Sequence, residues 1–120
     1  MKLLKRIEAA CAPVALCYVS GIDEETVIRV CAMHGFEAGE GMTDDEYLEA
    51  ATDLGLECIR VRNAKDMRLG AFVRKHATGL YLVATHDHLF AVDNGIVADC
   101  RNPDRPGLGR IVKAAWRVEK

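Results

Sequence analysis

The dipeptide Asn94-Gly95 is the feature that most restricts how this chain can fold. It lies between two apolar runs, residues 88–93 and residues 96–99. Both residues of the dipeptide tolerate the positive φ angles of a type I′ turn, and the pair is the strongest short signal for a two-residue β-hairpin. The sequence therefore predicts an antiparallel hairpin over residues 88–99.

Further strand signals surround this hairpin. Residues 80–84 precede it, and residues 111–118, which include Trp116, follow a loop rich in Gly and Pro. β-Branched and aromatic residues dominate this part of the chain, as is typical of strands. An earlier alternating segment, residues 56–62, also suits a strand. We expect a meander of antiparallel strands in the C-terminal part.

The first helix is expected at residues 11–20, which are almost wholly apolar. Pro13 fits its first turn, where the missing N–H costs nothing, and Gly21 follows its end. Asp23 then offers a cap for a second helix that carries an apolar stripe and ends near Gly35.

A third helix is predicted from a capping box, in which Thr43 is followed three residues later by Glu46. Gly55 stands where a helix C-terminus favours a left-handed residue. A fourth helix is expected from Asp66 to about His76. Helical signals thus come first along the chain and strand signals second.

This order predicts an α+β fold, with N-terminal helices packed on a C-terminal antiparallel β-sheet. We expect one domain over residues 1–120, mainly helical over about 1–78 and mainly sheet over about 79–120. A chain of 120 residues is long enough to bury roughly two-thirds of its unfolded surface. It needs neither a disulfide nor a cofactor to fold, and we expect none.

The composition of the chain limits the classes of partner that we expect for the protein. A net charge of -2 gives no reason to expect nucleic acid, and no apolar run approaches the roughly 18 residues of a membrane helix. Five cysteines without a CxxC pair indicate free thiols in the cytoplasm. Because Glu8 and Pro13 interrupt the first apolar stretch, we expect the chain to start as a mature N-terminus.

Cys11 stands where the first helix is expected to begin. A thiol at that place meets unpaired backbone N–H groups and the positive end of the helix dipole, and both stabilise thiolate over thiol. Cys11 is therefore the candidate nucleophile, whereas Cys17, Cys31 and Cys58 are interpreted as small buried hydrophobes.

His88 and Asp99 are the candidate base and orienting acid. Counting back from the turn pairs Phe90 with Asp99, so Asp99 is diagonal to His88 on one face of the hairpin. Diagonal neighbours lie roughly 7–8 Å apart at the backbone, within reach of a carboxylate and an imidazole. Nucleophile, base and orienting acid are the groups that cysteine catalysis requires.

These motifs resemble the papain-like cysteine peptidase superfamily, in particular small peptidases similar to bacteriocin leader-processing proteases and related phage-borne proteins. The Cys-Ala-Pro-Val-Ala-Leu segment at 11–16 is similar to that family's Cys-x-x-x-Ala-Leu helix start. The segments at 88–92 and 95–99 are similar to its His hairpin with a terminal Asp. The resemblance implies a papain-like fold and hydrolysis of a peptide or isopeptide bond through an acyl-enzyme at Cys11, with a peptide or protein as substrate.

The chain departs from the family pattern at two places. Where the family carries a Gln or Asn that donates to the oxyanion, this chain has Leu4, Lys5 and Arg6, so Lys5 and Arg6 are the oxyanion candidates. The family's Gly before the His is replaced by Asp87. Loss of one oxyanion donor typically slows such enzymes about a hundredfold or more.

Two other functions stay open. The first is a catalytically inactive binding or regulatory protein that keeps the papain fold. The second is a small metal-binding protein, because His86 and His88 share a strand face and could bind zinc with Cys100 or Cys11. The oligomeric state is left open by the sequence.

Overall fold

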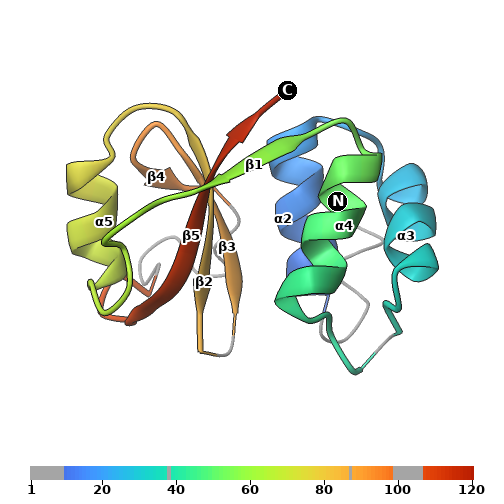
Figure 1. The fold of residues 1–120 in the computed structure, drawn as a ribbon, viewed down its shortest axis with the longest axis horizontal. Helices are drawn as coiled ribbons and strands as arrows, with labels where there is room; N and C mark the ends of the chain where they lie inside the picture. The colour runs from blue at the N-terminus through green and yellow to red at the C-terminus, as the bar shows by residue number, and fades with distance from the viewer. Residues whose placement is uncertain (1–9, 38, 87, 99–106) are drawn as a thin grey trace.

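The computed structural model of the protein describes residues 10–37, 39–86, 88–98 and 107–120. These residues form an α+β structure of four helices and one antiparallel sheet of five strands (Figure 1). The α+β class expected from the sequence is thus confirmed. In chain order the elements are α2 (Cys11–Ser20), α3 (Glu24–Met33), α4 (Asp44–Asp53), β1 (Glu57–Arg60), α5 (Leu69–Lys75), β2 (Leu80–Thr85), β3 (Leu89–Asp93), β4 (Ile96–Val97) and β5 (Val112–Glu119).

The strands lie in the order β1-β5-β2-β3-β4, and each is antiparallel to its neighbours. The predicted meander is confirmed for β2, β3 and β4. The last strand, however, inserts between β1 and β2 instead of continuing the meander. β1 comes from the mainly helical part of the chain, so both parts contribute to one sheet.

The hairpin turn has the geometry that its sequence predicts. Asn94 and Gly95 have φ angles of 49° and 79°. Val92 pairs with Val97, and the Ala98 N–H donates to the Ala91 carbonyl at 2.9 Å. The expected register is therefore confirmed over the described hairpin, and its next pair, which includes Asp99, lies outside the described residues.

Local signals also set the helix ends. Gly21 follows α2 with a φ of 70°, and its N–H donates to the Cys17 carbonyl at 2.9 Å. Asp23 accepts from the Thr26 N–H at 3.0 Å at the start of α3. The capping box of α4 is complete, with both reciprocal bonds between Thr43 and Glu46 formed.

Helices cover both faces of the sheet. One cluster of buried residues lies between the sheet and the layer of α2, α3 and α4, and a second lies between the sheet and α5 (Figure 1). Side chains of β3 alternate between the two, with Leu89 and Ala91 in the first cluster and Phe90 and Val92 in the second. A strand covered on both faces explains why four of its five residues are buried.

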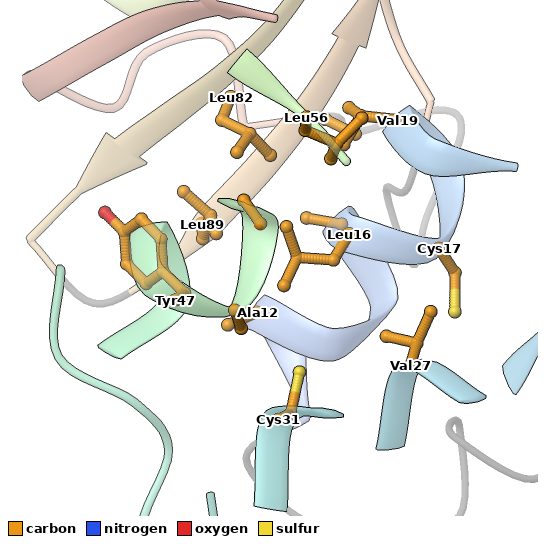
Figure 2. Packing of buried hydrophobic residues seen from close by; sticks show 14 of the residues in the cluster. Ala12, Leu16, Cys17, Val19, Val27, Cys31, Tyr47, Leu56, Leu82 and Leu89 are labelled. Atoms are coloured by element: carbon orange, nitrogen blue, oxygen red, sulfur yellow. The ribbon is translucent and has the colours of Figure 1, made fainter. Parts of the chain in front are cut away.

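The packing of α2 against β3 sets the position of the helix start. Leu16 is fully buried in the first cluster together with Leu82 and Leu89, and Figure 2 shows its side chain in this packing. The N-terminal ends of α2 and β3 lie at the same end of the molecule, the lower end in Figure 1. Among the described helices, none is long and apolar enough to cross a membrane.

His34, directly after α3, ties that helix to α4. Its Nε2 lies 2.5 Å from an Asp53 oxygen, and its Nδ1 lies 3.3 Å from a Glu49 oxygen. The hydrogen bond to Asp53 raises the pKa of His34 above its ordinary value, and the charges of both carboxylates add to this rise. The protonated ring is thus the form that joins the two helices.

We expect Leu16→Ala to lower the free energy of unfolding by about 2–5 kcal/mol, because it removes a large side chain from a fully buried site. Urea unfolding measures the loss. Tyr18→Ala, on the same helix but 40% exposed, is the control and should change stability far less. Equal losses in the two variants would contradict the packing described here.

We expect the stabilisation by His34 to be pH-dependent. A raised pKa in the folded state means that the contribution is complete below the unfolded pKa and disappears as pH rises through the folded pKa. Urea unfolding of wild type and His34→Gln between about pH 5 and pH 9 measures it, given an unperturbed His pKa of about 6.5. The difference in unfolding free energy between the two proteins should be largest at the acidic end of this range. A difference that does not change with pH would contradict the pH-dependent contribution of His34.

Candidate functional site

Cys11 is the first residue of α2, as the sequence predicts. Its side chain is partly exposed and packs against the first buried cluster. The preceding residue, Ala10, has no side-chain acceptor for the first-turn N–H groups. The Cys11 side chain thus lies at a helix start that has no side-chain cap from the preceding residue.

His88 directly precedes β3 and lies three residues after Thr85, the last residue of β2. The Thr85 N–H donates to the His88 carbonyl at 2.8 Å. The imidazole packs on Phe90, with ring centroids 4.3 Å apart. His88 is partly exposed, so its ring combines a fixed support with access to solvent.

Cys11 and His88 come from different layers. Cys11 packs in the cluster under α2, whereas the ring partner of His88, Phe90, belongs to the cluster under α5. The segments that carry them nevertheless begin at the same end of the molecule (Figure 1). The structure thus places the starts of α2 and β3 at one end of the molecule, while Cys11 and the ring partner of His88 belong to clusters on opposite faces of the sheet.

Of the other predicted site residues, some lie outside the described part of the chain and one lies within it. Asp99, Lys5, Arg6 and Cys100 lie outside the described residues. His86 is exposed in the turn before His88. Within the described ranges, no group of three or more His, Cys, Asp or Glu side chains is placed to hold a metal ion.

A polar cluster that the sequence interpretation missed lies beside Cys11. The Tyr47 hydroxyl donates to an Asp44 carboxylate oxygen at 2.7 Å, and Lys113 Nζ lies 3.5 Å from the other oxygen. The Tyr47 ring meets Trp116 edge-on at 5.7 Å. Asp44 was interpreted only as a helix-capping acid, and its spacing of three residues from Tyr47 on one helix was the available signal.

The electrostatics of this cluster keep Tyr47 protonated. Burial raises the pKa of Tyr47, and the hydrogen bond to Asp44 raises it further. Negative charge on Asp44 and on Cys11 acts in the same direction, and Arg60 acts against it. The Cys11 side chain is thus close enough to Tyr47 to contribute to the raised pKa of the Tyr47 hydroxyl.

Three other thiols are poorly suited to nucleophilic chemistry. Burial raises the pKa of Cys17 to about 11 and that of Cys31 to about 12, and it also raises the pKa of Cys58. Thiolate is the reactive form, so these side chains react slowly near neutral pH. Cys17 and Cys31 are buried, as expected, and Cys58 is partly buried.

We expect Tyr47→Phe to lower the free energy of unfolding by about 1–2 kcal/mol, because it removes a buried hydrogen bond to a carboxylate. Urea unfolding measures the loss, and Tyr18→Phe, at an exposed position, is the control. In the Asp44→Asn background the loss should shrink, since the charged acceptor is gone. An equal loss of unfolding free energy in that background would show that the Tyr47 hydroxyl does not stabilise the fold through Asp44.

The end of the molecule at which α2 and β3 begin is the candidate site, with Cys11 and His88 as its reactive groups. Comparisons of the chain with protein-family models, with curated proteins and with solved structures found no match.

Proposed function

We propose that this protein is a papain-like cysteine hydrolase that cleaves a peptide or isopeptide bond through an acyl-enzyme at Cys11. One observation carries the proposal: Cys11 begins a helix that packs along β3, and β3 begins directly after His88. Such an arrangement supplies a thiol at a helix start and an imidazole at the same end of the molecule. Both are exposed enough to meet a substrate.

The proposed reaction has two halves, the formation of the acyl-enzyme at Cys11 and its hydrolysis. The Cys11 thiolate attacks the carbonyl carbon, and the Cys11 backbone N–H donates to the oxyanion that forms. The C–N bond then breaks as protonated His88 gives its proton to the leaving amine. In the second half His88 takes a proton from water, the hydroxide attacks the thioester, and the carboxylic acid leaves as the C–S bond breaks, which restores the Cys11 thiolate and protonated His88.

Asp99 is proposed to orient His88. The described register reaches Ala91 and Ala98, and Asp99 follows Ala98 in the sequence. A continued register would set Asp99 opposite Phe90, diagonal to His88. Lys5 or Arg6 is proposed as the second donor to the oxyanion, in place of the family's Gln.

The proposal also includes a fold, a cellular compartment and a partner for the enzyme. The helices before the sheet and the antiparallel hairpin are compatible with a minimal papain-like fold. Four described cysteines are free thiols, which suits a reducing compartment such as the cytoplasm. The proposed partner is a peptide or protein substrate.

A second candidate function is a binding protein that keeps this fold without turnover. The observation that favours it is the packing of the His88 ring on Phe90, a residue of the cluster on the face opposite α2. An imidazole held there would support the hairpin and leave Cys11 without a base. The two candidates differ in whether the reactivity of Cys11 depends on His88.

We expect iodoacetamide to label Cys11 faster than any other thiol at neutral pH, as followed by mass spectrometry. His88→Ala should slow this labelling at least about tenfold near pH 6–7, because an unassisted thiol ionises only near pH 8.5. His86→Ala removes an exposed histidine two residues away and is the matched control. It should leave the rate unchanged.

Turnover is tested separately with a mixture of natural peptides. New amino termini should appear with wild type and be absent with Cys11→Ala. If His88→Ala and His86→Ala label Cys11 at the wild-type rate, the hydrolase proposal fails and the binding protein is favoured.

A further inference from the structure

Thr85, the last residue of β2, holds the backbone of His88 by two hydrogen bonds. Its backbone N–H donates to the His88 carbonyl oxygen at 2.8 Å, and its side-chain hydroxyl donates to the same oxygen at 3.2 Å. We propose that Thr85 is a positioning residue that fixes the base His88 for its work with Cys11. This inference rests on the proposed hydrolase function.

The burial of Thr85 supports this role. Its side chain is 4% exposed, and Thr85 is the one buried polar residue in the part of the chain that the structure describes. A buried hydroxyl without a partner would destabilise the fold, so a hydrogen bond at this position is strongly favoured. The bond to the His88 carbonyl satisfies the donor and fixes the peptide plane of His88 at the same time.

The strands around Thr85 fix its own position. On one side, β2 pairs with β3 up to Ala84 and Leu89, and Thr85 and His88 are the next residues beyond that pair. On the other side, Thr85 pairs with Val112 of β5, and the register shifts between Ala84 and Thr85. A residue anchored between two strands can hold a flanking turn residue in one place.

The imidazole itself has a second constraint. Its ring packs on Phe90, two residues along, at a centroid distance of 4.3 Å. Thr85 thus acts on the backbone of His88, whereas Phe90 contacts the ring. A held backbone limits the positions that the imidazole can reach, and small displacements of a base from its productive geometry lower the rate of proton transfer.

The test compares Thr85→Val, which removes the hydroxyl and keeps the shape, with Thr85→Ser, which keeps the hydroxyl. In the full chain, we expect Thr85→Val to slow the His88-dependent labelling of Cys11 about threefold to tenfold at neutral pH, the effect of one neutral hydrogen bond. The pH profile should shift with it. Thr85→Ser should restore both the rate and the profile.

Thr52→Val is the matched control, since the Thr52 hydroxyl also donates to a backbone carbonyl, that of Leu48, but within α4. It should leave labelling unchanged. NMR titration of the His88 imidazole supplies a second readout, whose midpoint should move in Thr85→Val and return in Thr85→Ser.

A folded Thr85→Val variant with the wild-type pH profile and the wild-type His88 midpoint would overturn the inference. A Thr85→Ser variant that loses the wild-type pH profile or the wild-type His88 midpoint would also overturn the inference, even if Thr85→Val does not fold. The two proposals fail separately. If His88→Ala leaves labelling unchanged, the hydrolase proposal falls, while the His88 midpoint in Thr85→Val still decides whether Thr85 controls the imidazole.

Discussion

The packing of α2 against β3 is the interaction on which the rest of this structure depends. Leu16 from the helix and Leu89 from the strand are buried in one cluster, which α3 and α4 extend with Val27 and Tyr47. Because the helix and the strand run in the same direction, their first residues lie at one end of the molecule. Cys11 begins the helix and His88 directly precedes the strand, and these are the two side chains proposed to react.

Signals that act over a few residues allowed much of the fold to be predicted. Asn94-Gly95 fixes a turn because its φ angles are positive, and Thr43 with Glu46 fixes a helix start through two reciprocal bonds. The insertion of β5 between β1 and β2 could not be predicted in this way. Its position depends on pairing between residues far apart in the chain, for which a single sequence carries no local signal.

Local sequence patterns also allowed part of the candidate site to be predicted. The place of Cys11 at a helix start follows from local patterns, and so does the shared strand face of His88 and Phe90. Which face α2 would cover does not follow from them, because alternation defines two faces without assigning a helix to either. The role of Thr85 was missed because its hydroxyl meets the His88 carbonyl only when β2 and β3 pair. The Tyr47 hydrogen bond was missed although its partner Asp44 lies three residues earlier on the same helix.

The proposed hydrolase function requires that the ionisation of Cys11 and that of His88 be coupled. NMR titration of the His88 imidazole in wild type and in Cys11→Ala measures this coupling directly. A thiolate near the imidazole favours the imidazolium, so the account predicts a lower His88 midpoint in Cys11→Ala than in wild type. The same midpoint in both proteins would contradict the account.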